Sequence, residues 1–402
     1  MRPLDFPDLE QEKEKIIEMF SRAEDIPRQD VRVIASPYRI CPLGAHIDHQ
    51  GGPVLGMTIN SCTLLAFVPV NGKEVRLRSH NYPGRVKFDL EDIPVAAGSF
   101  WGVYACAAAL ALKEKYPLDR GVTGHLNGML PGCGLSSSAS VLLAYLHALA
   151  AANELRLEPW EYVRLTRRAE NEFIGLSNGI LDQTSIVFGR HGHLLHIDTK
   201  AENVHAMPDV AGDRAYRILV AYSGYSRELT TTGYNSRVQE CREAAAQLSQ
   251  MAGAEPARIL SDVPQEAYFK HGHRLDPMLA RRARHYFTEV QRVRDGAAAW
   301  EAGQIDVFGR MMTESCRSSI AQYECGSPPI QDLQQIVNTA EGVVGSRFMG
   351  GGFGGCVVGL VKPGHAAVTA ADVQESYRKL HPEVADQAAV YLGRSDDGVR
   401  FV

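Results

Sequence analysis

The segment from residue 131 to residue 152 constrains the fold of this chain more than any other feature. It reads PGCGLSSSAS over 131–140 and continues as an apolar run to Ala152. Glycines let backbone N–H groups approach an anion closely, and the first turn of a helix adds unpaired N–H donors and partial positive charge. A serine helix cap after a glycine turn would explain one of these serines but not all of them. The segment therefore predicts a phosphate-binding loop that leads into a buried helix. It is not a Walker A loop, because no Gly-Lys-Ser/Thr follows.

The length and composition of the chain indicate a globular protein of more than one lobe. The chain has 402 residues, of which 45% are hydrophobic and 22% charged, and a domain usually takes roughly 100–200 residues. We expect an N-terminal lobe over 1–200 and a C-terminal lobe over 201–402, joined in the polar stretch 198–213. The net charge of -5 and the lack of a basic run argue against nucleic acid as a partner.

Other features exclude membrane insertion and a zinc site. The longest apolar stretch, 141–152, is shorter than the roughly 20 residues of a membrane span. The acidic N-terminus lacks the apolar core of a signal peptide, so we expect a cytoplasmic protein. The 8 cysteines form no C-x-x-C pair, which favours reduced, buried thiols over metal or redox chemistry.

The apolar periodicity predicts a mixed α+β chain. Helices are expected at 9–23, 101–113, 138–152, from Pro159 onward, and at 234–251, 276–302, 331–341 and 373–379. Strands are expected at 31–35, 62–70, 74–78, 86–90, 121–126, 186–188, 194–197, 217–221, 356–361 and 388–391. Loops are expected at 36–53, 175–183 and 345–355.

A second glycine loop, GGGFGG at 350–355, has two interpretations. It formally contains G-x-G-x-x-G, but the strand-like CVVGLV follows it where a dinucleotide-binding fingerprint needs a helix. We therefore reject dinucleotide binding. A tight turn with close backbone packing and backbone contact with a ligand remain equally open.

Polar side chains gather in two further loops. Arg39, His46, Asp48 and His49 stand among the glycines and prolines of the first, which is typical of a small-molecule site. Glu170 and Asp182 flank the second, where one carboxylate suits Mg²⁺ and the other suits a proton acceptor. Taken alone, Glu170 would more often lie on a solvated helix face.

Together these segments resemble the GHMP kinases, and within that family the galactokinase branch. SPYRICPLGAHIDHQGG at 36–52, GCGLSSSAS at 132–140 and GGGFGGC at 350–356 occur in the family's order. AENEFIGLSNGILDQ at 169–183, YNSRVQEC at 234–241 and RHYFTEVQRV at 284–293 are also similar to galactokinase segments. The resemblance spans about 31–361. It implies two α+β lobes with the active site in the cleft between them, a ferredoxin-like C-terminal lobe, ATP and Mg²⁺ as cofactors, and a sugar as acceptor.

The resemblance also implies roles for single residues. Asp182 would take the sugar hydroxyl proton or assist its removal, and Arg39 would stabilise the attacking oxygen and the phosphoryl charge. Mg²⁺ would be held by Ser138 (or Ser137) and Glu170. The positions implied for the ATP phosphates are Gly132, Gly134, Leu135, Ser136, Ser137 and Ser138, with Gly351 and Gly352 closing the site from the second lobe. The positions implied for the sugar are Ala45, His46, Asp48, His49, Gly179 and Tyr234.

Two departures from the galactokinase pattern bear on the substrate. Galactokinases carry Glu where this chain has Ala45, and Tyr where it has His49. That Glu contacts the C6 hydroxyl in the family, so its loss removes an anion and opens space for a C6 carboxylate. His49 would add a donor or partial positive charge nearby. We therefore expect D-galacturonic acid, phosphorylated at the anomeric hydroxyl, ahead of D-galactose.

Further segments weigh on the same choice. The first loop, LTTTGYNSRVQEC at 229–241 and YECGSPP at 323–329 resemble galacturonokinases, whereas the uninterrupted glycine loop at 350–355 favours galactose. His49 and Arg227 are guesses for the group that binds the carboxylate. Trp101 or Tyr104 would stack on adenine or lie in the core.

Two rival functions fit less well. A non-catalytic relative that senses sugar and ATP would be free to lose Asp182 or Arg39, and both are present. A kinase for a non-sugar alcohol such as mevalonate or homoserine conflicts with the His46/Asp48 pair and Tyr234. No obligatory protein partner is inferred.

Overall fold

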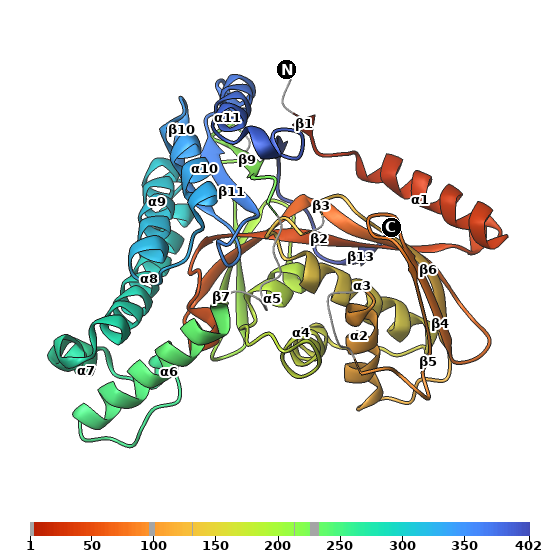
Figure 1. Cartoon of the computed structure of the whole chain (residues 1–402), viewed down its shortest axis with the longest axis horizontal. Coiled ribbons are helices and arrows are strands. Elements are labelled where there is room, and N and C mark those ends of the chain that lie inside the picture. Colours follow the sequence, from red (N-terminus) through yellow and green to blue (C-terminus); the bar gives the residue numbers. More distant parts are fainter. Residues whose placement is uncertain (1–3, 96–100, 131, 213, 226–232) are drawn as a thin grey trace.

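The computed structural model describes residues 4–95, 101–130, 132–212, 214–225 and 233–402 and folds into two sheets with helices packed around them (Figure 1). The larger sheet has 8 strands, in the order β13-β2-β3-β6-β4-β5, with β7 paired to β3 and β8 paired to β7. Its strands are β2 (Arg32–Leu43), β3 (Val54–Pro69), β4 (Glu74–Ser79), β5 (Arg85–Asp89), β6 (Val122–Gly128), β7 (His193–Asp198), β8 (Asn203–Pro208) and β13 (Arg400–Phe401).

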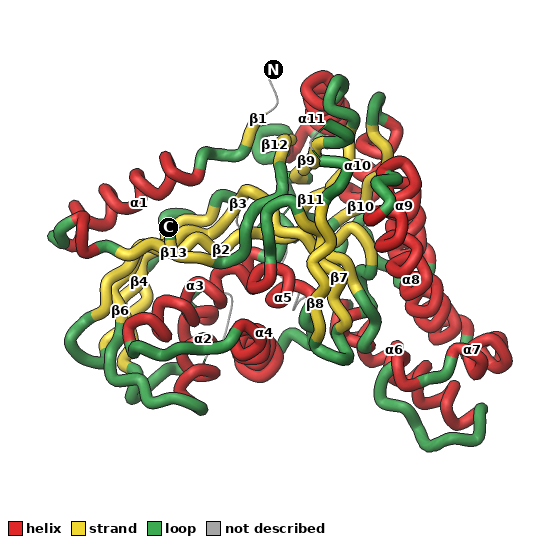
Figure 2. The backbone as a smooth tube through the Cα atoms, turned by 180° about the vertical axis from the view of Figure 1, so that it is seen from behind, coloured by secondary structure: helices red, strands yellow, loops and turns green. Residues whose placement is uncertain are grey.

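Helices cover both faces of this sheet. Alternate residues of β2 point to opposite faces, so that Ile34 packs with helices α2 and α3 while Val33 packs with α1. Figure 2 shows α1 on one side of the strands and α2, α3 and α4 on the other. The helix α3 is apolar all round and is almost wholly buried, as its sequence predicts. The helices of this half are α1 (Leu9–Glu24), α2 (Val103–Lys113), α3 (Ser137–Ala152), α4 (Pro159–Arg168) and α5 (Leu181–Phe188).

The smaller sheet has 5 strands in the order β1-β12-β9-β11-β10. Four of these strands form a β-α-β-β-α-β unit, which runs along the chain as β9, a set of helices, β10, β11, α11 and β12. Their antiparallel order in the sheet, β12-β9-β11-β10, is that of a ferredoxin-like fold. The strands are β1 (Leu4–Asp5), β9 (Arg217–Tyr222), β10 (Val343–Phe348), β11 (Cys356–Val361) and β12 (Ala389–Gly393). The helices are α6 (Tyr234–Met251), α7 (Gln265–His271), α8 (Pro277–Glu301), α9 (Ile305–Ala321), α10 (Pro328–Thr339) and α11 (Ala366–Leu380).

Both ends of the described chain cross between the sheets. The N-terminal β1 pairs with β12 of the smaller sheet, and the C-terminal β13 pairs with β2 of the larger one. The main hydrophobic core also joins the two halves, because Ile40 of β2 lies in one cluster with Phe308 of α9. The division into lobes 1–200 and 201–402 therefore stays a prediction.

Several expected elements are corrected by the structure. The strand β2 continues to Leu43 through the expected loop 36–53. Pro37 has no N–H to donate, so it fits only where no neighbouring strand needs that hydrogen bond. On the β13 side of β2 the pairing extends only to Ala35, and among the described residues no further strand pairs with that side at Pro37. The expected strand 186–188 is the end of helix α5, since a short apolar run does not by itself distinguish strand from helix. The strand β10 occupies the beginning of the expected loop 345–355. The elements not anticipated are β1, β8, β10, β13, α5, α7 and α9.

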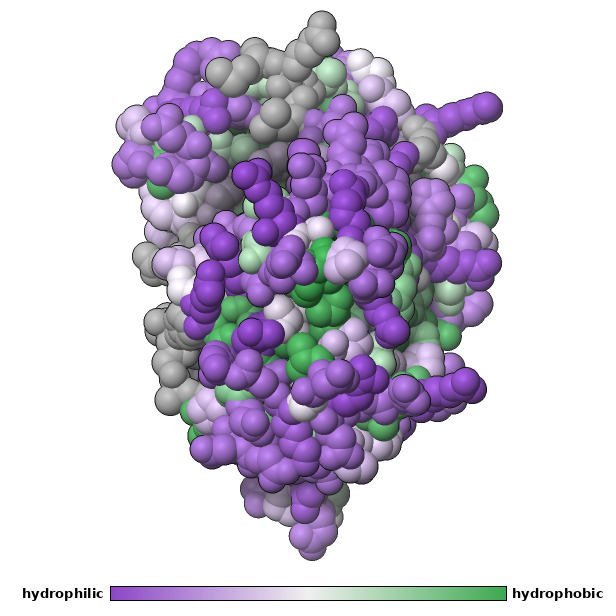
Figure 3. Space-filling model, turned by 90° about the vertical axis from the view of Figure 1, so that its right-hand side faces the viewer, coloured by the Kyte–Doolittle hydropathy of each residue, from purple (hydrophilic) through white to green (hydrophobic). Residues whose placement is uncertain are grey.

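No helix in the described part of the chain is long and apolar enough to cross a bilayer. Figure 3 shows one end of the molecule as mainly hydrophilic, with small hydrophobic areas between the polar side chains.

Candidate active site

Three chain segments meet around the carboxylate of Asp182. Arg39 on β2 donates from Nε to Asp182 Oδ1 at 2.8 Å, and Ser136 donates from Oγ to Asp182 Oδ2. The backbone N–H of Arg39 also donates to the carbonyl oxygen of Leu135 at 3.2 Å, which ties β2 to the 132–138 loop. Arg39 is 4% exposed and Asp182 23%, so the carboxylate faces outward from a buried guanidinium. Residues distant in sequence thus lie together around one carboxylate, and their role in catalysis stays a prediction.

The 132–138 loop has the backbone of an anion-binding turn. Gly132 and Gly134 have φ of 75° and 73°, and Ser136 has φ of 62°, in the left-handed region that glycine favours. The N–H of Gly132 donates to Ser137 Oγ at 3.0 Å. No side chain of the described residues caps α3, and no acidic residue lies in its first turn. The first amides of α3 therefore remain available to an anion.

The 349–355 loop packs directly on the 132–138 loop. A Cβ added at Gly350 would lie 3.0 Å from the carbonyl oxygen of Gly134, and one at Gly355 would lie 2.7 Å from that of Cys133. Gly352, with φ of 74°, has no room for a side chain against the ring of Phe348. Close backbone packing therefore explains these glycines. Gly351 is also buried beside them, and a direct role of Gly351 and Gly352 in closing the ATP site stays a prediction.

Glu170 is a buried carboxylate that faces the start of α3. Its Oε2 accepts hydrogen bonds from Asn178 Nδ2 at 2.7 Å and Gln183 Nε2 at 2.8 Å, while Oε1 lies 3.4 Å from Ser138 Oγ. Burial, together with the nearby charge of Asp182, raises the pKa of Glu170 to about 8. A cation beside Oε1 would offset both effects.

The donor set at Glu170 suits Mg²⁺. The structure shows no cluster of three or more His, Cys, Asp or Glu side chains suited to a metal within its described residues. Mg²⁺ in nucleotide sites typically takes one or two carboxylates and completes its shell with phosphate oxygens and water. Ser138 Oγ and Glu170 Oε1 therefore fit the protein side of a magnesium–nucleotide complex. Glu170 also lies in a π-helical turn, a local distortion frequent at functional sites.

Asp48 and Gly179 meet on the far side of Asp182. The N–H of Leu181 donates to Asp48 Oδ2 at 3.2 Å. A Cβ at Gly179 would lie 2.2 Å from the same oxygen, so only glycine fits there. Burial and the neighbouring Asp182 raise the pKa of Asp48 to about 6.

His46 offers a buried nitrogen without a protein partner. Its φ of 65° is unusual for a residue with a side chain, and its ring stacks on Tyr323 with centroids 4.6 Å apart. His46 Nε2 and Arg39 Nη1 are buried and accept or donate no hydrogen bond among the described residues. Buried polar atoms are nearly always paired in folded proteins, so both atoms point to a polar ligand.

His49 is expected to add a donor or a partial positive charge, and its surroundings disfavour the charge. Its Nε2 lies 2.9 Å from Tyr323 Oη, and its Nδ1 lies 3.0 Å from Gln50 Nε2, so both ring nitrogens are occupied. Burial, followed by the charge of Arg242, lowers the pKa of His49 to about 3. The imidazole is therefore neutral near pH 7. The other guess for a carboxylate-binding cation, Arg227, lies outside the described residues.

The two remaining positions expected to contact the sugar are Ala45, within the 44–52 loop, and Tyr234, beside it. Ala45 is 7% exposed, and Tyr234, the first residue of α6, is 8% exposed with its ring 6.1 Å from that of His49. Trp101 is buried in the core next to α2, and Tyr104 packs against the same core.

Three residues at the site were not predicted from the sequence. Tyr323, His285 and Glu289 contact the 44–52 loop from the second half of the chain. They occur in the galactokinase-like or galacturonokinase-like segments at 284–293 and 323–329. Nothing local in those segments indicates which side chains turn inward.

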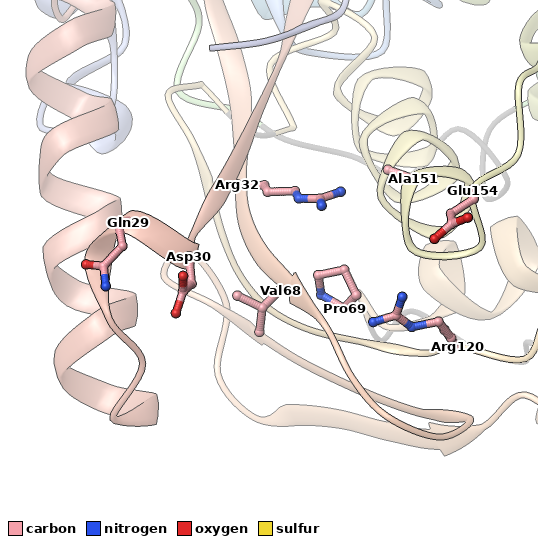
Figure 4. Close-up of a pocket in the computed structure, with 8 residues that line it drawn as sticks. All are labelled: Gln29, Asp30, Arg32, Val68, Pro69, Arg120, Ala151 and Glu154. Atoms are coloured by element: carbon pink, nitrogen blue, oxygen red, sulfur yellow. The ribbon is translucent and has the colours of Figure 1, made fainter.

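The hollow drawn in Figure 4 is separate from this site. It has a volume of about 480 Å³ and includes Arg32, Arg120, Asp30 and Glu154 in its lining, which shares no residue with the site around Asp182.

Comparison with known proteins identifies the family. The model of the GHMP kinases N terminal domain matches residues 103–190, and that of the GHMP kinases C terminal domain matches residues 297–379. A galacturonokinase of Arabidopsis thaliana is 42% identical over 395 residues, which cover 93% of this chain and 92% of that protein. The chain belongs to the GHMP kinase family. A galactokinase of Roseiflexus sp. is 33% identical, with 91% of this chain and 92% of that protein covered.

Solved GHMP kinase structures agree with the fold. The crystal structure of Lactococcus lactis galactokinase complexed with galactose has a TM-score of 0.87 at 29% identity, covering 96% of this chain and 98% of that one. Methanococcus jannaschii mevalonate kinase, at 17% identity and a TM-score of 0.64, supports the fold alone; 92% of this chain and 100% of that one are covered. The predicted two-lobed α+β fold and the predicted activity, an ATP-dependent sugar kinase, are thereby confirmed.

Proposed function

We propose that this GHMP kinase transfers the γ-phosphoryl group of ATP to the anomeric hydroxyl of D-galacturonic acid, which yields ADP and the sugar 1-phosphate. The observation that carries the chemistry is the Arg39–Asp182 pair at 2.8 Å, set against the 132–138 loop. The 42% identity to a galacturonokinase supports the substrate.

The geometry supports a mechanism of positioning and charge stabilisation. Arg39 and Ser136 each hold one oxygen of Asp182, so the carboxylate has a fixed direction toward a sugar hydroxyl. Asp182 orients that hydroxyl and takes its proton or assists its loss. The guanidinium of Arg39 stabilises charge on the attacking oxygen and the phosphoryl group.

The nucleotide would lie along the 132–138 loop. Backbone amides at the start of α3 bind its phosphates. Mg²⁺ held by Ser138 and Glu170 would neutralise charge on those phosphates. Asp48, His46 and Gly179 would hold the sugar next to Asp182.

Ala45 is the residue on which the proposed preference for galacturonate over galactose depends. A glutamate at this position, as in galactokinases, would repel a C6 carboxylate, whereas the Ala45 methyl group does not. His49 would contact the carboxylate without a positive charge, because burial lowers its pKa to about 3.

Galactose is the second candidate substrate. The uninterrupted glycine loop at 350–355 and the TM-score of 0.87 to a galactokinase complexed with galactose support it. The deciding assay is coupled ADP release with galacturonate and galactose side by side. A kcat/KM for galactose tenfold above that for galacturonate would reverse the proposed order. Turnover of either sugar would exclude the non-catalytic relative.

The variant Ala45→Glu tests the charge argument. Two like charges about 5 Å apart at an effective dielectric of about 20 repel by roughly 3 kcal/mol, which is on the order of a hundredfold. We expect Ala45→Glu to lower kcat/KM for galacturonate by about that factor more than for galactose. Ala45→Gln is the matched control, similar in size without the charge. Equal losses on both sugars in Ala45→Glu would remove the charge argument.

A further inference from the structure

Helix α8 contacts two consecutive residues of the 44–52 loop through its backbone. The N–H of Gly44 donates to Glu289 Oε1 at 2.8 Å, and His285 Nε2 bonds to the carbonyl oxygen of Ala45 at 2.9 Å. Residues 285 and 289 are four apart and so lie on one face of the helix. Their exposed fractions are 1% and 0%. A helix of the second half of the chain therefore holds the backbone on either side of the peptide link between Gly44 and Ala45. We call this pair of contacts the α8 clamp.

The loop needs such a restraint because its backbone is strained. Gly44 has φ of 91°, and a Cβ there would lie 2.6 Å from Val54 Cα. His46 has φ of 65° despite its side chain. Glycine adopts a positive φ without strain, but the conformation at His46 costs on the order of 1–3 kcal/mol and persists only where the surroundings impose it. The α8 clamp binds the backbone of Gly44 and Ala45, directly before His46.

The hydrogen bonds of His285 fix the tautomer and the orientation of its ring. A carbonyl oxygen only accepts, so Nε2 of His285 carries the proton that bonds to Ala45. Burial lowers the pKa of His285 to about 4, and the neutral ring then accepts at Nδ1 from Ser318 Oγ, 2.9 Å away. Each nitrogen has one partner, and Ser318 on α9 sets the plane of the ring.

The carboxylate of Glu289 is equally constrained. Arg292 Nε donates to its Oε2 at 2.7 Å, and Ser315 donates to its Oε1. Arg347 on β10 lies 3.8 Å from the same carboxylate. Burial acts to raise the pKa of Glu289, but Arg292, Arg347 and the hydrogen bond from Ser315 outweigh it, and the pKa lies below its usual value. The anion that holds Gly44 is therefore itself anchored to α8, α9 and β10.

We propose that His285 and Glu289 are positioning residues that set the place of Ala45 and His46, and thereby the affinity for the sugar and the preference between galacturonate and galactose. The proposal rests on the proposed function, in which Ala45 and His46 face the sugar. In the described contacts neither His285 nor Glu289 touches the 132–138 loop. We therefore expect substitutions of these two residues to change sugar binding and not ATP binding.

The first test compares His285→Phe with His285→Gln in the full-length enzyme. Phe keeps a ring but has no donor, whereas the Gln amide can still donate to Ala45. Since small misplacements in a site can cost up to about a hundredfold, we expect His285→Phe to raise the sugar KM about tenfold or more. The ATP KM should stay within about twofold, and the galacturonate-to-galactose ratio of kcat/KM should shrink. His285→Gln should recover most of the sugar KM.

A fold control separates positioning from stability. Leu279→Ala removes a buried side chain of α8 nearly three turns before Glu289, and it is expected to lower the melting temperature without changing either KM. If His285→Phe behaves like Leu279→Ala, or if His285→Gln is as impaired as His285→Phe, the proposal is wrong.

A second readout does not depend on turnover. Hydrogen exchange of the free protein should show faster exchange over residues 44–47 in Glu289→Leu, which has no acceptor for the Gly44 N–H, and in His285→Phe than in the wild type, with the 132–138 loop unchanged. Unchanged protection of 44–47 would overturn the clamp. Lack of turnover of either sugar by the wild type would instead overturn the proposed function, so the two failures are distinct.

Discussion

The variant Glu170→Gln tests the protonation of the buried carboxylate beside α3. A glutamine has nearly the same shape, and its carbonyl oxygen can accept the bonds that Asn178 and Gln183 now give to Glu170. Its amide nitrogen can face Ser138 Oγ, because a hydroxyl also accepts. The substitution therefore removes the titrating group and keeps the hydrogen bonds.

The magnitude follows from the raised pKa. Burial and the charge of Asp182 raise the pKa of Glu170 from 4.5 to about 8, so the folded protein favours the protonated carboxyl. The stability that this provides is fully present below pH 4.5 and is lost as the pH rises through about 8. At about 1.4 kcal/mol per pH unit the loss amounts to about 5 kcal/mol. Glu170→Gln does not undergo this loss.

The assay is urea unfolding of the metal-free proteins at a series of pH values in EDTA. We expect the two proteins to differ by less than about 1 kcal/mol near pH 5 and the variant to be more stable by up to about 5 kcal/mol above pH 8. Glu172→Gln is the matched control, since Glu172 lies two residues away with 54% of its side chain exposed. A gap between Glu170→Gln and wild type that does not change with pH would refute the reasoning.

The same variant also reports on the cation. Mg²⁺ and ATP stabilise the folded protein in proportion to their affinity, and Mg²⁺ needs the ionised carboxylate. We expect added Mg²⁺ and ATP to stabilise the wild type more than Glu170→Gln. Equal stabilisation of the two proteins would remove Glu170 from the proposed metal site.

Two further predictions concern the acceptor side of the site. Asp182→Asn should lower kcat by a factor of about 10²–10⁴ with the sugar KM little changed, because the amide keeps the shape of the side chain but cannot act as the base. Steady-state kinetics together with a melting curve checks this, and a turnover above about a tenth of the wild-type value would contradict it. Gly179→Ala places a Cβ 2.2 Å from Asp48 Oδ2 and should displace that carboxylate. We expect this displacement to raise the sugar KM about tenfold or more while the ATP KM stays unchanged. An unchanged sugar KM would show that Asp48 does not hold the sugar.

Much of the candidate site could be predicted because its signals are local. A glycine-serine turn before an apolar helix favours an anion through its backbone geometry, and α3 begins at Ser137, directly after that turn. The resemblance named Arg39 and Asp182, 143 residues apart, and their side chains form an ion pair.

Other features depended on neighbours far away in the chain. The strand β2 runs beyond Ser36 and Pro37 because its second half packs against helices of the other half of the chain, which no local pattern reveals. The neutrality of His49 follows from burial and two occupied nitrogens, although the sequence shows only a histidine in a polar loop.

The sequence by itself determined the family, and it predicted the phosphate loop and the residue types that face the reaction, since these depend on short segments with fixed backbone demands. Only the tertiary structure decided how the 44–52 loop is held, because its partners His285 and Glu289 lie 240 and 245 residues from the groups they bind. It also decided why the 349–355 loop is rich in glycine: two backbones approach so closely there that a Cβ at Gly355 would lie 2.7 Å from a carbonyl oxygen of the other loop. Contacts between distant segments arise from packing, and packing is a property of the whole chain.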